Sequence, residues 1–354
     1  MKRLLIALAC WLAALGMNAA SVTSPNGNIE LKFSIDQTGR PVYAVTYKGR
    51  DIILPSHLGL ELAKDKHASK GLKETDLMDG FTLKSEQTST FDETWQPVWG
   101  ENRDIRNHYT EYVAVLQQQA EQREMAIRFR VYDDGIGFRY EFPQQKELNY
   151  FLIQDERSEF RMTGDHTAWW LPGDYDSQEY NYKECRLSEI NRYCEEMRIP
   201  NASQEGFSPW GVQTAIQMKT DEGLYLNIHE AAVLDYPAAN LLYDPVHQVF
   251  QIHLTPDAQG VKGRLQAPCK TPWRSVMVCQ SATDVLASRL ILNLNDPCAI
   301  EDVSWIHPVK YVGVWWEMIT GKTKSFFLPN QSSQPSFHPS TRTASKPFSA
   351  AKSI

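Results

Sequence analysis

The sequence predicts an all-β protein built from two large antiparallel sheets. Apolar and polar residues alternate with a period of two in many short segments, as they do in strands that bury one face. Turn sequences such as Asp133-Asp134-Gly135 separate several of these segments, and no segment before residue 300 keeps a helical period over three turns. With 354 residues, the chain is long enough to bury a large core between such sheets.

The first twenty residues have the pattern of a secretory signal. Lys2 and Arg3 precede an apolar run over residues 4–17, and Asn18-Ala19-Ala20 is a small-residue cleavage site. That run is too short to cross a bilayer. The sequence therefore predicts a secreted protein without a membrane anchor, whose mature chain starts near Ser21.

Strands are predicted in order along the mature chain, beginning with a hairpin. Residues 29–35 and 42–47 alternate in polarity, and the turn at 37–41 contains Gly39 and Pro41. A short helix is expected at residues 188–197. Further strands are predicted at residues 58–62, 112–117, 126–132, 137–142, 224–228, 249–254 and 287–294.

The segment 164–182, GDHTAWWLPGDYDSQEYNY, has the residue types of a sugar-binding loop. Trp169 and Trp170 precede a Leu-Pro-Gly break, and Tyr175 follows it. Aromatic rings offer apolar faces to sugars, and carboxylates bind sugar hydroxyls or a hard cation such as calcium. Aromatic packing beneath a polar turn would give the same composition. The carboxylates of this loop are Asp174, Asp176 and Glu179.

A second aromatic segment covers residues 91–109, FDETWQPVWGENRDIRNHY. Trp95, Trp99 and His108 lie among charged side chains, in a stretch that we interpret as too polar for a core strand. It forms either a loop held by Arg–carboxylate pairs or a wall of a pocket. Elsewhere, His229 and Glu230 end a predicted strand, without the H-E-x-x-H pattern of zinc proteases.

Composition excludes several classes of partner. The formal net charge is −7 and the sequence has no basic stripe, which argues against nucleic acid and anionic membranes as partners. The cysteines form no zinc-binding C-x-x-C pair. Cys185 and Cys194 could pair across a short loop or remain as buried free thiols.

The character of the chain changes after Pro308. Residues 310–316, KYVGVWW, form an apolar run of the kind expected for a buried parallel strand. Residues 323–354 are rich in Ser and Pro, contain no acidic residue and predict disorder. We interpret this as a chain cut or frameshifted near Lys322.

Eight segments, in the same order, resemble the N-terminal part of glycoside hydrolase family 97, over about residues 21–322. The resemblance implies a galactose-mutarotase-like β-supersandwich at residues 21–300, after a signal peptide at 1–20. It also implies the start of a truncated (β/α)8 barrel at 301–322, a single vestigial strand followed by the disordered tail. The segments are FDETWQPVWG (91–100), IRNHY (105–109), GIGFRYEFPQQ (135–145), PGDYDSQEY (172–180), HEAAVLDY (229–236), LTPDAQGVKG (254–263), LNLNDPC (292–298) and VKYVGVWWEMITGK (309–322).

The resemblance also implies a periplasmic location and a function, the calcium-dependent hydrolysis of α-linked glucosides. By its position in PGDYDSQEY, Glu179 corresponds to a calcium-binding glutamate that the supersandwich supplies. The catalytic carboxyl groups of the family lie on barrel loops beyond the first barrel strand, so no catalytic residue is expected here. Because calcium takes 6 to 8 oxygen ligands, Glu179 alone should bind it weakly.

Three functions stay open. The first is an N-terminal domain, inactive alone, that binds an oligosaccharide or α-glucoside and completes an active site. The second is a stand-alone secreted carbohydrate-binding module. The third is a complete hydrolase with carboxyl groups among Asp174, Asp176, Glu179 and Glu230, which the resemblance disfavours. The expected sugar-binding residues are Trp95, Trp99, His108, Trp169, Trp170 and Tyr175.

Overall fold

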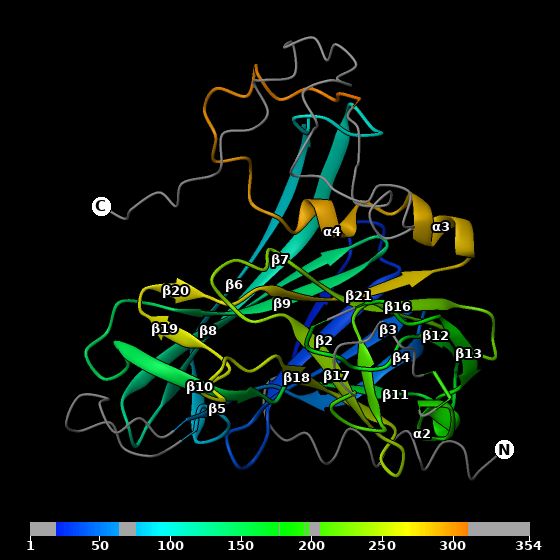
Figure 1. The fold of residues 1–354 in the computed structure, drawn as a ribbon. Coiled ribbons are helices and arrows are strands. Elements are labelled where there is room, and N and C mark those ends of the chain that lie inside the picture. The colour runs from blue at the N-terminus through cyan, green and yellow to red at the C-terminus, as the bar shows by residue number, and fades with distance from the viewer. Residues whose placement is uncertain (1–18, 64–75, 177, 195, 198–205, 311–354) are drawn as a thin grey trace, which may run out of the picture. The chain divides into compact units, whose positions relative to one another are not determined.

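The computed structural model describes residues 19–63, 76–176, 178–194, 196–197 and 206–310. The chain divides into two units, Met1–Glu301 and Asp302–Ile354. The described part of the first unit consists of two large antiparallel sheets, with a small sheet and short helices (Figure 1). This confirms the predicted all-β class. In the second unit, residues 302–310 form turns without a helix or strand.

The first sheet has eight strands. Its strands alternate in burial: in β3 every second residue, from Pro41 to Tyr47, is buried. The alternation leaves one face for the core and one for solvent. In spatial order the strands are β1 (Ala20–Thr23), β2 (Ile29–Ile35), β3 (Pro41–Tyr47), β4 (Arg50–His57), β11 (Glu159–Met162), β18 (Val249–Leu254), β17 (Ala239–Asp244) and β14 (Gly211–Gln213).

The second sheet has ten strands. Its central strand β21 is buried at every position from Trp273 to Cys279, whereas the edge strand β6 is exposed along most of its length. In order along the sheet the strands are β13 (Lys183–Arg186), β12 (Thr167–Trp170), β15 (Ile216–Lys219), β16 (Tyr225–Ala231), β21 (Trp273–Cys279), β9 (Gly135–Phe142), β8 (Arg123–Tyr132), β7 (Ile105–Gln118) and β6 (Phe81–Trp95), with β20 (Cys269–Lys270) paired to β9.

Smaller elements complete the unit. The three-stranded sheet consists of β19 (Arg264–Gln266), β10 (Tyr150–Glu156) and β5 (Leu60–Leu62). The helices are η1 (Leu187–Glu189), α2 (Ile190–Cys194), α3 (Ala282–Ala287) and α4 (Leu290–Asn293). Helices η1 and α2 agree with the helix that the sequence predicts at residues 188–197.

Aromatic side chains from both large sheets meet in the main core. The ring centroids of Tyr43 and Phe138 are 5.2 Å apart, and those of Phe33 and Phe129 are 5.6 Å apart. Each pair joins a strand of the eight-stranded sheet to a strand of the ten-stranded sheet. Such pairs contribute roughly 0.5–1.5 kcal/mol each beyond the area that they bury. The two sheets are therefore held face to face by this core.

The prediction of a strand at residues 287–294 is wrong. The structure has the end of α3 and helix α4 there. The Ser281 hydroxyl caps α3 by accepting a hydrogen bond from the Asp284 backbone N–H at 3.2 Å. Leu290 and Leu294, four residues apart, then pack into a second core cluster. A short apolar run fits a buried helix as well as a strand, which explains the error.

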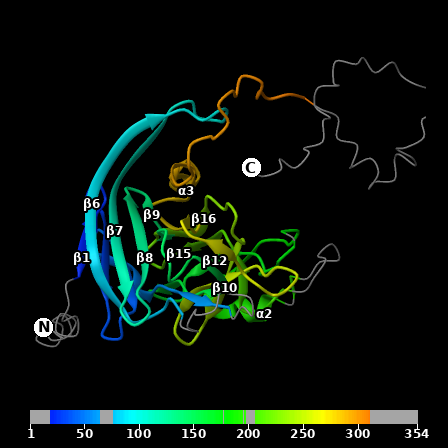
Figure 2. The same cartoon turned by 90° about the vertical axis from the view of Figure 1, so that its left-hand side faces the viewer.

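The prediction of a long loop at residues 91–109 is also wrong. Strand β6 continues to Trp95 and β7 begins at Ile105, so only residues 96–104 connect them. Figure 2 shows both strands as one long, curved hairpin. Polarity misled the prediction because β6 is an edge strand with few buried residues. The expected Arg–carboxylate pair does occur, since Arg106 binds Asp92 through two hydrogen bonds of 2.8 and 2.7 Å.

Several predictions fall on residues that the structure does not describe. The apolar run at 310–316, apart from Lys310, and the tail at 323–354 lie outside the described residues, as does the signal up to residue 18. Strand β1 begins at Ala20, the last residue of the predicted signal. Among the described residues, no helix is long and apolar enough to cross a membrane. Cys185, which is buried, and Cys194, which is partly buried, are not joined by a disulfide bond.

Candidate functional site

A pocket of about 280 Å³ opens beside the loop that follows β12. Strands β14, β16 and β17 contribute its other walls. We call it the acidic pocket because Asp174, Asp176 and Glu230 all line it. Its remaining lining residues are Tyr175, Gln178, Gln213, Thr214, Ala238, Ala239, Asn240 and Thr255.

The Leu-Pro-Gly break positions the loop of the pocket. Pro172 forms an isolated bridge with Val212, and the Gly173 N–H donates to the Gly211 carbonyl at 2.9 Å. A Cβ atom on Gly173 would overlap the ring of Phe207, so the close approach requires glycine. The loop is thereby held against β14.

Asp174 stabilises the turn that presents Tyr175. Its carboxylate accepts hydrogen bonds from the Asp176 backbone N–H at 2.7 Å and from the Tyr180 hydroxyl at 2.8 Å. The first is a local turn interaction that aspartate favours. Asp174 is buried, whereas Asp176 is exposed. The loop therefore offers the pocket a rigid tyrosine next to one solvent-facing carboxylate.

A chain of hydrogen bonds orients the Tyr175 hydroxyl. His253 Nε2 lies 2.7 Å from this hydroxyl, and Lys262 Nζ lies 3.3 Å from His253 Nδ1 and 2.7 Å from Asp155 Oδ2. Burial, followed by the charge of Lys262, lowers the pKa of His253 to about 4, so this imidazole is neutral at neutral pH.

The donor and acceptor in each of these hydrogen bonds can be assigned from the lysine. A lysine ammonium has no acceptor, so Nδ1 of His253 must accept from Lys262 and the hydrogen of the neutral ring sits on Nε2. Nε2 then donates to the Tyr175 oxygen. The hydroxyl hydrogen of Tyr175 is left to donate to a pocket ligand.

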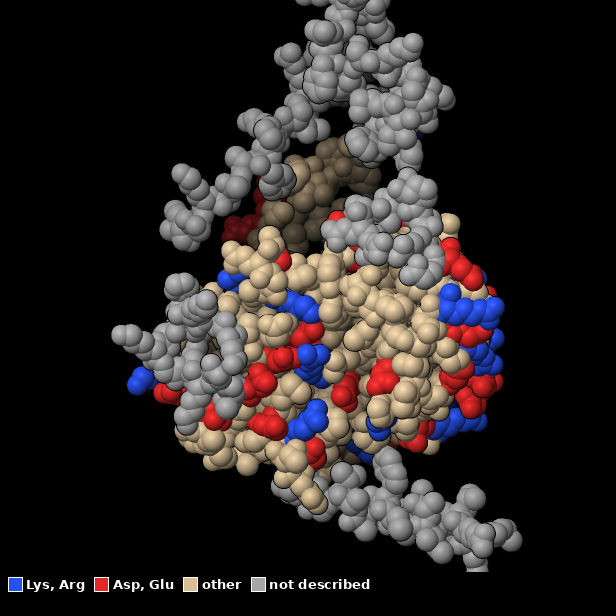
Figure 3. Space-filling view, turned by 60° about the horizontal axis from the view of Figure 1, so that its bottom comes forward, with Lys and Arg blue, Asp and Glu red and all other residues tan. Residues whose placement is uncertain are grey.

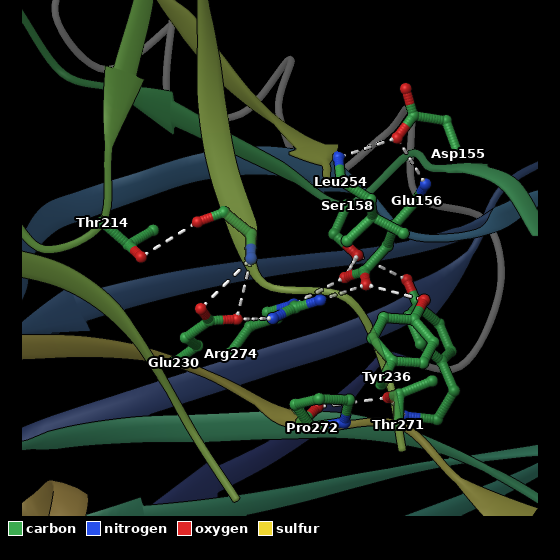
Figure 4. Close-up of polar contacts among 12 residues, drawn as sticks. Asp155, Glu156, Ser158, Thr214, Glu230, Tyr236, Leu254, Thr271, Pro272 and Arg274 are labelled. Carbon is green, nitrogen blue, oxygen red and sulfur yellow. Dashed lines mark hydrogen bonds and ion pairs between the residues drawn. The ribbon is translucent and has the colours of Figure 1, made fainter. Parts of the chain in front are cut away.

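Glu230 connects the acidic pocket to a buried ion cluster of Glu156, Glu230 and Arg274 (Figure 4). Arg274 donates to Glu230 Oε2 at 2.6 Å, and to Glu156 at 3.0 and 2.7 Å. Glu230 also accepts from the Ala239 backbone N–H at 3.1 Å. The cluster joins β16 and β21 of the ten-stranded sheet to the end of β10.

Burial governs the protonation of this cluster. Arg274 is 1% exposed. Burial raises the pKa of Glu230, although Arg274 and the Ala239 N–H oppose the shift. Burial would lower the pKa of Arg274, but Glu156 and Glu230 outweigh it and raise this pKa. The guanidinium therefore stays charged, with its hydrogen bonds directed to the two carboxylates.

The predicted sugar-binding residues of β12 have different surroundings. Trp169 is partly exposed, and its Nε1 donates to Glu184 at 3.0 Å. Trp170 is 0% exposed, belongs to the main core and donates to Cys185 Sγ at 3.1 Å. Of the three aromatic residues predicted in this segment, Tyr175 is the one that lines the acidic pocket.

Trp95, Trp99 and His108 lie on the β6–β7 hairpin instead. Strand β6 ends one edge of the ten-stranded sheet and β12 lies beside the other edge, so the structure does not bring the two aromatic groups together. Trp95 Nε1 donates to Asn293 Oδ1 at 2.9 Å, and Trp99 is 66% exposed. His108 is partly exposed and faces Asp92 across the hairpin.

The described residues do not fit a calcium ion by themselves. Glu179 is exposed, in the loop after Asp174. The part of the chain that the structure describes contains no group of three or more His, Cys, Asp or Glu side chains placed to hold a metal. Calcium takes 6 to 8 oxygen ligands. A calcium site at Glu179 would need oxygen ligands from beyond these residues.

Sequence reasoning missed the far wall of the acidic pocket. Gln213, Thr214, Asn240 and Thr255 reach it from the ends of three strands that pair only in the fold. Amides and hydroxyls at strand ends have no distinctive spacing in a sequence. His253 and Lys262 were equally invisible, although the second lies in the motif LTPDAQGVKG.

Two large antiparallel sheets packed face to face define a β-sandwich domain. The sequence profile described as "Glycosyl-hydrolase 97 N-terminal" matches residues 22–297. The chain belongs to glycoside hydrolase family 97 and contains the N-terminal part of such an enzyme.

Characterised relatives agree with this membership. The chain is 27% identical over 335 residues to a retaining α-galactosidase of Bacteroides thetaiotaomicron, covering 89% of this chain and 47% of that protein. A family 97 enzyme from Pseudoalteromonas sp. strain K8, solved with acarbose, is 33% identical with a TM-score of 0.72, over 84% of this chain and 41% of that one.

A variant of a family 97 enzyme from the same strain, in complex with panose, has a TM-score of 0.73 at 33% identity, over 86% of this chain and 42% of that one. A β-arabinopyranosidase, 17% identical over 74% of this chain and 40% of that one with a TM-score of 0.60, shares the fold. The chain spans about half the length of its curated relative.

Proposed function

We propose that this chain is the carbohydrate-binding, active-site-completing domain of a secreted glycosidase that acts on α-linked glucosides and depends on calcium. The acidic pocket carries this proposal. Tyr175 lines it and its contact with His253 leaves the hydroxyl hydrogen available to a ligand, and Asp176, Gln178 and Asn240 offer further polar groups to sugar hydroxyls. The acarbose and panose bound by the similar Pseudoalteromonas enzymes support an oligosaccharide as the ligand.

We further propose that the chain is catalytically inactive by itself. Glycoside hydrolysis needs one carboxyl group to protonate the leaving oxygen and a second to attack or to activate water. Glu230 is held by Arg274 and the Ala239 N–H, and Asp174 by Tyr180 and the Asp176 N–H. Carboxylates that accept such hydrogen bonds stabilise the fold and are not available for proton transfer to a substrate.

In this proposal Glu179 supplies one calcium ligand. Its exposure leaves it accessible to a second part of the enzyme, which would provide the other oxygen atoms. Among the other predicted contacts, Trp169 lies on the same strand that leads into the pocket loop. Trp95, Trp99 and His108 would bind a saccharide only at a second site, on the β6–β7 hairpin and apart from the acidic pocket.

Titration of panose into the purified chain, followed by NMR, tests the proposal. Weak binding is expected, and Tyr175→Phe should weaken it about fivefold because one hydrogen bond of about 1 kcal/mol is lost. Tyr182→Phe is the matched control, since Tyr182 is exposed and does not line the pocket. Melibiose in place of panose distinguishes α-galactosides from α-glucosides.

Two other results would redirect the proposal. Panose binding that survives Tyr175→Phe but disappears in Trp99→Ala would favour a stand-alone module that binds through the hairpin. Hydrolysis of p-nitrophenyl α-glucoside by the chain with calcium, lost in Glu179→Gln, would show a complete active site within these sheets.

A further inference from the structure

A second pocket, of about 570 Å³, lies on the outer face of the eight-stranded sheet. Phe160 of β11 and Phe250 of β18 point into the main core, so the residues next to them in sequence face outward. We call this the outer-face pocket, and the residues that matter below are Arg40, His57, Glu159, Arg161, Trp210 and Tyr243.

The acidic groups of the outer-face pocket are already paired. Glu159 Oε2 accepts from the backbone N–H of His57 and contacts His57 Nδ1, both at 3.0 Å. Asp244, at the rim, lies 2.6 Å from His247 Nδ1. These interactions satisfy the carboxylates within the protein. Burial would raise the pKa of Glu159, but the His57 contacts, with a further contribution from the charge of Arg40, lower it.

Two arginines in the same pocket are not paired. Within the described residues, neither the Arg40 nor the Arg161 guanidinium makes a hydrogen bond or an ion pair. The Nε atom of Arg40 is buried without an acceptor from the protein. Buried donors without acceptors are costly, so this geometry favours an acceptor from outside the chain. Planar guanidinium groups suit a carboxylate.

An aromatic side chain lies at the other end of the pocket. The Trp210 ring is partly exposed, and its centroid is 6.0 Å from that of Tyr243. The Trp210 carbonyl accepts from the Tyr243 N–H at 3.0 Å, which fixes its position beside β17. The pocket thus crosses β4, β11, β18 and β17, four neighbouring strands. Three interstrand spacings of about 4.8 Å give it a length of about 14 Å.

We propose that the outer-face pocket binds an acidic oligosaccharide. Arg40 and Arg161 bind the carboxylate of a uronic acid residue, and a neighbouring sugar ring stacks on Trp210. A site for a small anion would not require the Trp210 ring, and a site for a neutral sugar would not require two arginines. The combination therefore favours a sugar that carries a carboxylate. A polyanion such as nucleic acid is disfavoured by the surface, where Figure 3 shows acidic and basic side chains interspersed.

Calorimetric titration with trigalacturonate tests this site. Arg161→Gln and Trp210→Ala should each weaken binding at least about tenfold, because one removes a charge-assisted contact and the other a stacking surface. Arg103→Gln is the control, since Arg103 is exposed between β6 and β7. Circular dichroism of each variant checks that it is folded.

The comparison ligands decide between the chemistries. Maltotriose should bind at least about tenfold more weakly than trigalacturonate, and 0.5 M salt should weaken trigalacturonate binding through screening of the two arginines. Inorganic phosphate that competes at equal concentration, together with an unchanged affinity in Trp210→Ala, would overturn the proposal in favour of a simple anion site. Tyr175→Phe should bind trigalacturonate normally, so failure of the acidic pocket and failure of this one are distinguishable.

Discussion

The buried ion cluster and the β6–β7 hairpin use the same chemistry in opposite surroundings. Arg274 and Arg106 each bind a carboxylate through two hydrogen bonds of 2.7 to 3.0 Å. The side chains of Arg274 and Glu156 are 1% and 0% exposed, whereas those of Arg106 and Asp92 are 62% and 50% exposed. The contribution of an ion pair to the free energy of unfolding therefore depends more on its burial than on its hydrogen-bond geometry.

The two pairs also differ in their distance along the chain. Arg106 and Asp92 are 14 residues apart and lie diagonally across neighbouring strands, where Arg106 is opposite Thr94 and Asp92 is opposite His108. Arg274 and Glu156 are 118 residues apart, and the pair exists only after β10 and β21 have been placed. The hairpin pair is a local product of strand register, and the buried cluster is a product of the whole fold.

Removing Arg274 should have the largest effect on stability. Arg274→Ala leaves Glu156 buried without its charge partner, which typically costs about 3–5 kcal/mol. Urea denaturation of the variant and the wild type measures the difference in the free energy of unfolding. Arg274→Ala with Glu156→Gln is the informative second variant, because it removes one of the two carboxylate charges that lose their partner and should recover part of the loss. A loss no larger than that of an exposed arginine would contradict the role assigned to burial.

The hydrogen bonds that link Tyr175, His253 and Lys262 predict that the stability of the fold depends on pH. The pKa of this imidazole is about 4 in the folded protein and 6.5 when unperturbed, so the unfolded chain binds a proton first as the pH falls. Stability should therefore be lost between pH 6.5 and 4, by up to about 3 kcal/mol. The shape of the curve of Tm against pH measures this loss.

His253→Gln should flatten that curve over the same interval. His247→Gln is the control, because His247 is exposed and pairs only with Asp244 in its own turn. A His253→Gln curve as steep as the wild-type curve would mean that other groups cause the acid sensitivity. It would also weaken the orientation assigned to the Tyr175 hydroxyl.

The contrast between local and distant contacts also explains what the sequence could predict. Alternation in residues 29–35 and 249–254 predicted β2 and β18 with their observed bounds, because period two is a local property. The Arg–carboxylate pairing at residues 91–109 was one of two alternatives that the sequence left open. The polarity of β6 was misread because nothing in a sequence marks an edge strand.

The site was harder to predict than the fold. Tyr175 and the carboxylates of its loop were found because one short segment contains them. Trp170 was chosen by composition, but its burial depends on packing between strands distant in sequence. Arg274, His253 and Lys262 carried no signal, since their partners are brought to them only by sheet topology. A pocket assembled from several strands is visible in sequence only through its longest loop.

Trp95 connects the hairpin to α4 and should have an intermediate effect. Trp95→Phe removes the hydrogen bond from Nε1 to Asn293 Oδ1, in partly buried surroundings, while it keeps an aromatic ring. A loss of about 1 kcal/mol in the free energy of unfolding is expected by urea denaturation. Trp99→Phe, at an exposed position without such a bond, should leave stability unchanged. Equal losses in both would show that the hydrogen bond contributes nothing.

Arg106→Gln should have the smallest effect, and it makes the comparison sharpest. The Asp92 carboxylate holds the pKa of Arg106 above its usual value, and the arginine in turn lowers the pKa of Asp92. Both groups are solvated in the folded and the unfolded chain, so the Asp92 carboxylate remains in contact with water when the pair is broken. The urea midpoint should not change measurably, at low or high salt. If Arg106→Gln instead destabilised the protein as much as Arg274→Ala, the β6–β7 hairpin would have to be covered by other protein in solution. The exposure of Arg106 and Asp92 in this structure would then not describe their surroundings in solution.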